Sequence, residues 1–179
     1  GEHSIIIDPG ISATGWVMEN AKNPIAILNT HGHFDHVWSN QTLKEYFKIP
    51  LYTPEDDIFM LTQQQFDMDV PPSHADVIVK RDESFELAGF KFTFHHFPGH
   101  TPGNSMIEFE NCFFSGDFIF NGGIGRTDFP FSSPDDMKKS IQKFLANFSE
   151  NKTIYPGHND ATDVNSAKSM LPQWLLYLS

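Results

Sequence analysis

The sequence is poor in cysteine, in basic residues and in long apolar runs. Cys112 is its only cysteine, which excludes an intrachain disulfide and a paired-cysteine metal site. Lys and Arg number 12 against 23 Asp and Glu, a formal net charge of −11, so neither a nucleic acid nor an anionic membrane surface is expected as partner. No apolar run approaches the roughly 20 residues of a membrane span. With no signal-peptide pattern, the single cysteine predicts a cytoplasmic protein.

The 179 residues alternate short apolar runs with amphipathic segments, which predicts an α/β (α+β) fold in a single domain over residues 1–179. Helices are expected over about 36–47 and over about 161–170, the latter ended by Pro172. Two more are expected to begin at an N-cap: a short one after Thr53, and one after Ser133 that continues to about 148. Strands are expected at 5–7, 25–28, 84–87, 90–97, 105–109, 112–115 and 153–155.

Histidine is the residue type that points to chemistry. Three histidines and an aspartate fall within His31-Gly32-His33-Phe34-Asp35-His36, directly after an apolar strand and before a helix. Residues i and i+2 of an extended chain point the same way, so His31 and His33 can bind one ion. Asp35 and His36 lie where the helix begins and can face a second ion. Imidazole and carboxylate are ligands that zinc, iron and manganese accept.

Three further segments place a ligand-type side chain just after an apolar run. They are Pro98-Gly99-His100-Thr101-Pro102-Gly103, Ser115-Gly116-Asp117 and Pro156-Gly157-His158. Each alone is an ordinary turn. Together with the histidine cluster they put ligand-type groups at the ends of four strands, where open sheets gather their sites.

This ordered set, HxHxDH, GHTPG, SGD and PGH, resembles the metallo-β-lactamase superfamily. The segment Gly122–Phe129 narrows the resemblance to the glyoxalase II-like and persulfide dioxygenase-like branch, and the resemblance extends from Ile5 to His158. It implies a four-layer αββα sandwich. Members usually begin with a strand or two before the Ile5–Ile7 run, which leaves two alternatives: a truncated chain, or first strands that the pattern does not reveal.

The resemblance also implies the ligand set. His31, His33 and His100 would hold a first metal ion, Asp35, His36 and His158 a second, and Asp117 would bridge them. The ions are most often zinc in this family, with iron or manganese in glyoxalase II-like members. Two divalent ions would make the site locally positive and suited to a small anionic substrate. The sequence gives no indication of the oligomeric state.

The function expected from this set is hydrolysis of a thioester, as in a hydroxyacylglutathione hydrolase, or of a related small acyl compound. A hydroxide bridging the two ions would attack the acyl carbon, with Asp35 orienting it or taking its proton. The additional helical domain of true glyoxalase II has no counterpart in the 21 residues after His158, which puts glutathione thioesters in doubt. The alternative is an iron-dependent persulfide dioxygenase-like oxidoreductase. A metal-binding module without catalysis is disfavoured, because a structural zinc site needs only four ligands.

Several other residues receive ordinary interpretations. Cys112 lies in an apolar strand and is expected to be a small core residue rather than a nucleophile. Arg126 and Asp128 are expected to pair and hold the glycine-rich loop near the site. Phe34 and Phe118 neighbour ligand residues and are candidates for lining an apolar pocket.

Overall fold

The computed structural model describes residues 3–178, which fold into two compact units, residues 3–81 and 82–178. Each unit combines a β-sheet with helices, so the predicted mixture of helices and strands is confirmed. None of the helices in residues 3–178 has the length and apolar character needed to cross a bilayer. The prediction of one domain over residues 1–179 stays a prediction.

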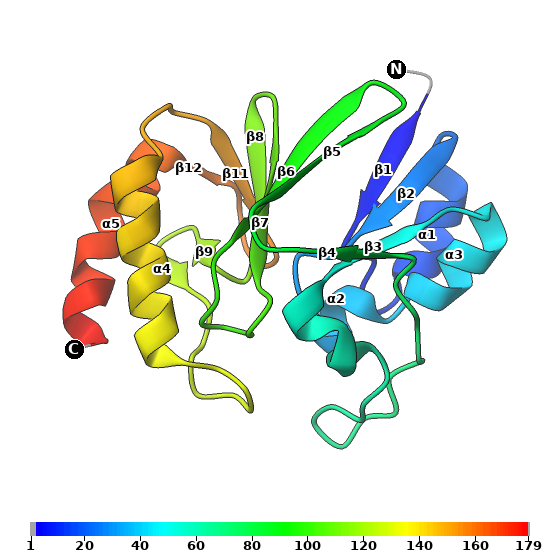
Figure 1. Ribbon diagram of the computed structural model, residues 1–179, viewed down its shortest axis with the longest axis horizontal. Coiled ribbons are helices and arrows are strands. Elements are labelled where there is room, and N and C mark those ends of the chain that lie inside the picture. The colour runs from blue at the N-terminus through cyan, green and yellow to red at the C-terminus, as the bar shows by residue number, and fades with distance from the viewer. Residues whose placement is uncertain (1–2, 179) are drawn as a thin grey trace. The chain divides into compact units, whose positions relative to one another are not determined.

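The first unit is built on a sheet of four parallel strands in the order β1-β2-β3-β4 (Figure 1). The strands are β1 (Ser4–Ile7), β2 (Pro24–Leu28), β3 (Leu51–Pro54) and β4 (Val77–Val79). The connecting helices are α1 (Ala13–Asn20), α2 (Phe34–Val37), α3 (Asn40–Phe47) and the 3₁₀ helix η1 (Glu55–Leu61). Ile27 of β2 and Leu51 of β3 pack with Val17 of α1 and Leu43 of α3 in one buried cluster. Crossover connections of this kind are what parallel strands require.

Two helix predictions in this unit need correction. The helix expected over 36–47 is broken into α2 and α3, because the Ser39 N–H donates to the carbonyl of Pro9 at 2.9 Å instead of continuing the helix. Thr53 is not an N-cap. It lies in β3, and its hydroxyl donates to Oδ1 of the buried Asn29 at 3.1 Å.

The second unit contains a six-stranded sheet in the order β12-β11-β8-β7-β6-β5 and a two-stranded sheet of β9 and β10. The longer strands are β5 (Glu83–Leu87), β6 (Phe90–His96), β7 (Ser105–Phe109), β8 (Cys112–Gly116) and β11 (Thr153–Pro156). The short strands are β9 (Ile119–Phe120), β10 (Gly123–Ile124) and β12 (Thr162–Asp163). Strand β11 pairs parallel to β8, and the other pairs of this sheet are antiparallel.

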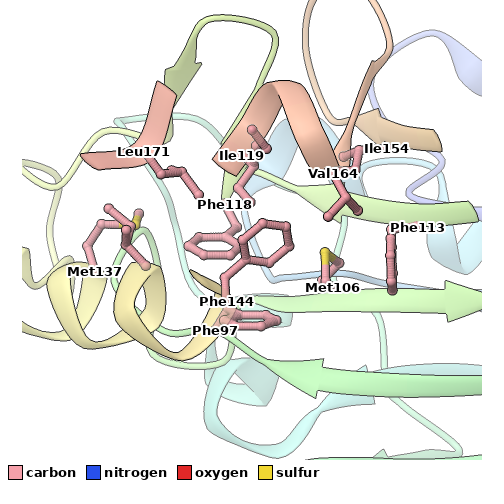
Figure 2. Close-up of a cluster of buried hydrophobic side chains, with 12 residues drawn as sticks. Phe97, Met106, Phe113, Phe118, Ile119, Met137, Phe144, Ile154, Val164 and Leu171 are labelled. Atoms are coloured by element: carbon pink, nitrogen blue, oxygen red, sulfur yellow. The ribbon is translucent and has the colours of Figure 1, made fainter. Parts of the chain in front are cut away.

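Helices α4 (Pro134–Asn147) and α5 (Val164–Tyr177) lie side by side on one face of this sheet (Figure 1). The predicted start of α4 is confirmed: Ser133 Oγ accepts the N–H of Asp136, and Pro134 follows the cap. The core between helices and sheet is rich in aromatic residues, which Figure 2 shows as sticks. The rings of Phe97 and Phe118 stack within it, with centroids 4.5 Å apart. Phe118 is fully buried in this core, so the suggestion that it lines a pocket is wrong.

The last helix also differs from its prediction. It begins at Val164 after Asp163, whose carboxylate accepts the Ser166 N–H, and it continues through Pro172 to Tyr177. Proline inside a helix costs about 3 kcal/mol. Leu171 is fully buried in the core of the second unit and Trp174 packs against it, and this burial on both sides of Pro172 offsets the cost.

Candidate metal centre

In the first unit, two neighbouring parallel strands deliver polar side chains to one edge of the sheet. Ile7, the last residue of β1, lies opposite Leu28, the last residue of β2. Asp8 follows β1 directly, and Thr30 and His31 follow the end of β2 by two and three residues. The backbone N–H of Thr30 donates to Asp8 Oδ1 at 2.7 Å. The sheet register therefore brings Asp8 to the start of the histidine cluster.

Asp8 determines which nitrogen carries the hydrogen on two of the histidines. Its Oδ2 accepts the Thr30 hydroxyl at 2.6 Å and lies 3.0 Å from Nδ1 of His36. Because an ionised carboxylate only accepts, Nδ1 of His36 donates. The Thr30 hydroxyl gives its hydrogen to Asp8, so its oxygen accepts from Nδ1 of His31 at 3.0 Å. Both rings consequently keep Nε2 as the unprotonated nitrogen that a metal binds.

The other predicted ligands of this unit lie beside these two rings. The His33 ring is perpendicular to the His31 ring, with centroids 5.0 Å apart, and the His36 ring lies 4.1 Å from that of His31. Asp35 Oδ2 lies 3.7 Å from Nε2 of His36. The structure thus brings together His31, His33, Asp35 and His36, as the sequence predicts for this segment.

Two buried side chains hold the loop that carries the ligands. Asp57 of η1 accepts the N–H of Gly32 at 2.9 Å. The Gln65 amide donates to the Gly32 carbonyl at 2.9 Å and accepts the Phe34 N–H at 3.0 Å. A Cβ at position 32 would lie 2.8 Å from Cβ of Met60, so only glycine fits this approach. The loop is fixed before any ion arrives, as a preorganised site requires.

The second unit has its own cluster at one edge of the six-stranded sheet. Strands β6, β8 and β11 all run in the same direction, and His100, Asp117 and His158 come soon after their ends. Nε2 of His100 lies 3.3 Å and Nε2 of His158 3.4 Å from Oδ2 of Asp117. The second unit therefore brings together the remaining three predicted ligands around one carboxylate oxygen.

His100 is oriented by the backbone of the glycine-rich loop. Its Nδ1 lies 2.8 Å from the carbonyl oxygen of Arg126, which can only accept, so Nδ1 donates and Nε2 is unprotonated. Gly125 approaches so closely that an added Cβ would lie 1.8 Å from the carbonyl oxygen of Asp117. The predicted pair is also confirmed: the Arg126 guanidinium binds both carboxylate oxygens of Asp128 at 2.7 and 2.8 Å. This hydrogen bonding lowers the pKa of Asp128.

Three residues of this arrangement were missed by sequence reasoning: Asp8, Asp57 and Gln65. Asp8 carried a usable signal, because it is an acidic residue directly after a buried strand, like Asp117. Asp57 and Gln65 carried none, because Gly32, the residue that both hold, lies 25 and 33 residues away in the sequence. Cys112 shows no sign of activation, because burial raises the pKa of its thiol.

The donor atoms fit a divalent transition-metal ion. Asp8, His31 and His36 lie close enough together to hold one ion, but the hydrogen bonds make Asp8 an outer partner and leave Nε2 of each ring as the ligand atom. The candidate ligands of both units are imidazoles and carboxylates, the set that zinc, iron and manganese bind, and three imidazoles have their second nitrogen occupied by an acceptor. Such outer partners are what metal-ligating histidines usually have.

Comparisons of the sequence and of the structure with known proteins agree on one family. The family model described as "Metallo-beta-lactamase superfamily" matches residues 1–158. The hydroxyacylglutathione hydrolase GloC of Haemophilus influenzae is 34% identical over 96% of this chain and 87% of its own length.

Two solved structures are similar over nearly the whole chain. The BLEG-1 B3 metallo-β-lactamase has a TM-score of 0.87 and 27% identity, covering 97% of this chain and 89% of its own. TTHA1623, solved in a di-iron-bound form, has a TM-score of 0.77 and 29% identity, covering 93% and 87%. The fold predicted from the motifs is thereby confirmed, and the chain belongs to the metallo-β-lactamase superfamily.

Proposed function

We propose that this chain is a metal-dependent hydrolase that cleaves a thioester or a related small acyl compound. The observation that carries the proposal is the hydrogen bonding of the imidazoles: Nδ1 of His31, His36 and His100 each lies within 3.0 Å of an oxygen that accepts, which leaves Nε2 of each ring for a ligand. This arrangement supports a bound cation, because metal-ligating histidines usually have an acceptor at their second ring nitrogen.

The proposed centre holds two divalent ions. His31, His33 and His100 form one ligand set, Asp35, His36 and His158 the other, and Asp117 is shared. Zn²⁺ is the first choice, and Fe²⁺ or Mn²⁺ would accept the same donors. When bound, such ions lower the pKa of water and polarise a carbonyl group.

Asp35 is the proposed catalytic residue of the chain itself. Its side chain is about one-third exposed, so it remains open to water while Oδ2 lies beside the His36 ring. In this position the carboxylate would orient the attacking water and accept its proton. The water oxygen forms a bond to the acyl carbon as the C–S bond breaks, and the products are a carboxylate and a thiol. Thiolate is a good leaving group, which favours thioesters over amides.

The similarity to GloC supports this choice of substrate, because that relative is a hydroxyacylglutathione hydrolase. We further propose that the substrate is small and anionic, and that the protein acts in the cytoplasm. The formal charge of −11 disfavours nucleic acid as an alternative substrate.

The test combines metal analysis with three assays on one preparation. The metals are measured by mass spectrometry, and the protein is assayed for thiol release from acyl thioesters, for β-lactam opening and for oxygen uptake with a persulfide. Thioester cleavage that depends on two bound ions supports the proposal. Oxygen uptake with a single bound iron would establish the dioxygenase-like alternative instead. Cleavage of the β-lactam alone would favour a β-lactamase, the activity for which BLEG-1 is named.

A further inference from the structure

A strained turn stands beside the histidine cluster in the first unit. Gln65 and Met68 exchange both backbone hydrogen bonds, at 2.9 and 3.3 Å, and enclose a two-residue loop. Its two central residues, Phe66 and Asp67, have φ of +50° and +59°. Such turns favour the sequence Asn-Gly, because residues other than Gly, Asn and Asp are disfavoured at positive φ. A phenylalanine there is held against its own backbone preference.

Gln65 attaches this turn to the ligand loop. Its amide bonds to Gly32 and Phe34 on one side and donates to the Met60 carbonyl at 2.8 Å on the other. Three hydrogen bonds from one buried side chain leave the turn little freedom to move relative to His33. The strain at Phe66 persists because its neighbours determine the backbone there.

The turn places the Phe66 ring against a predicted metal ligand. Its centroid lies 5.8 Å from that of His33 and 5.7 Å from that of Phe34. The residue is nevertheless 43% exposed, so a large part of it faces solvent. A strained backbone that keeps an aromatic residue partly exposed beside a ligand is a reason to look for function there.

We propose that Phe66 is a specificity-determining residue. Together with Phe34 it forms an apolar wall beside His33 that receives the apolar part of an acyl group. The inference rests on the proposed thioester hydrolysis and assigns its substrate class: acyl compounds with an aliphatic or aromatic substituent, in preference to acetyl. Each methylene buried against such a wall should improve kcat/KM by about fourfold.

The experiment compares acetyl, butyryl, hexanoyl and phenylacetyl thioesters of one thiol. In the wild-type protein, kcat/KM should rise by about tenfold or more from acetyl to phenylacetyl. Phe66→Ala and Phe66→Asn should reduce the ratio of kcat/KM for the phenylacetyl thioester to kcat/KM for the acetyl thioester to about three or less. In both variants kcat/KM for the acetyl thioester should change by about threefold at most. Tyr46→Ala is the matched control, because Tyr46 is an exposed aromatic residue of α3 in the same unit. It should leave the ratio unchanged.

Phe66→Asn separates recognition from folding. Asparagine tolerates the left-handed backbone, so the melting temperature of this variant should equal or exceed that of the wild type. Its preference for phenylacetyl over acetyl thioesters should be lost. A lower melting temperature with unchanged selectivity would assign Phe66 a structural role and overturn the proposal. An equal loss of kcat/KM for every acyl group would overturn it as well.

A binding measurement keeps this inference separate from the proposed function. Phenylacetate and acetate are titrated calorimetrically into the metal-loaded protein and into Phe66→Ala. If no thioester is cleaved, the proposed function fails. Tighter binding of phenylacetate that disappears in Phe66→Ala would still support the apolar wall, and equal affinity in the two proteins would remove it.

Discussion

Asp8 Oδ2 lies 3.0 Å from Nδ1 of His36 and also accepts the Thr30 hydroxyl, which in turn accepts from His31. One carboxylate at the end of β1 therefore fixes the hydrogens of two imidazoles that follow β2. The side chain of Asp8 is 12% exposed, so water competes little for these hydrogen bonds.

Replacing this carboxylate should weaken metal binding without removing a predicted ligand. Asp8→Asn turns one acceptor into a donor, so His36 loses its partner and its orientation. The metal affinity should fall by about 10- to 100-fold, measured by competition with a chelator. Asp76→Asn is the control: Asp76 accepts the Leu51 N–H and pairs with Lys44 in the same unit, and its loss should leave metal affinity intact. Unchanged affinity in Asp8→Asn would contradict the role given to Asp8.

Removing a ligand should abolish metal and activity together. His33→Ala and Asp117→Ala each delete a donor, one in each unit, and should leave protein with less bound metal and with activity near background, measured by mass spectrometry and thiol release. His74→Ala, which removes an exposed histidine of the first unit, should keep both. Full activity in Asp117→Ala would refute the bridging assignment.

Gly125 should tolerate no side chain. A Cβ there would lie 1.8 Å from the Asp117 carbonyl oxygen and 3.1 Å from Cγ of His100, so Gly125→Ala must displace at least one of these residues. We expect about 1–3 kcal/mol of destabilisation and reduced metal content. Gly15→Ala is the matched control, because a Cβ at this position of α1 meets nothing within 4 Å. It should stabilise the protein by about 0.5–1 kcal/mol. Thermal unfolding with metal analysis measures both.

Glu108 should make the second unit sensitive to acid. Burial raises the pKa of the Glu108 carboxyl, but hydrogen bonds from Lys152 and His95, both at 2.7 Å, lower it by more. The net result is a pKa below the ordinary 4.5. The folded state therefore holds the proton less tightly than the unfolded chain does. The stabilisation is complete above the unfolded pKa and is lost as the pH falls through the lower folded value.

Glu108→Gln should consequently cost about 1 kcal/mol at pH 7 and flatten the acid limb of the stability curve. Urea unfolding at pH 7 and below pH 4 measures the difference. Parallel curves for the two proteins would show that the ion pair contributes nothing to pH dependence. Asp163→Asn provides a comparison, because that carboxylate accepts a neutral backbone N–H, that of Ser166, at the start of α5.

The strands and the ligand segments were readable because their signals are local. An apolar run followed by His, Asp or Gly marks a strand end, and the runs at Ile5, Phe90 and Cys112 all form strands at the predicted places. Helix α4 was equally readable, since Met137, Ile141 and Phe144 recur in the sequence at helical spacing, and all three are fully buried.

The features that were missed depend on tertiary contacts. Helix α1 buries only Val17, so its sequence contains no apolar stripe to read. Strand β4 has three residues and is recognisable only through its pairing with β3. Asp57 and Gln65 act on Gly32 from 25 and 33 residues away. No spacing rule connects such positions before the chain folds.

His36 and His100 differ in how sensitive their orientation is to amino-acid substitution at the residue that holds them. His36 relies on the side chain of Asp8, so a single codon change can remove its support. His100 relies on the main-chain oxygen of residue 126, which every amino acid supplies. Substitutions at position 126 should therefore leave the tautomer of His100 intact, whereas substitutions at position 8 should weaken the binding of the metal.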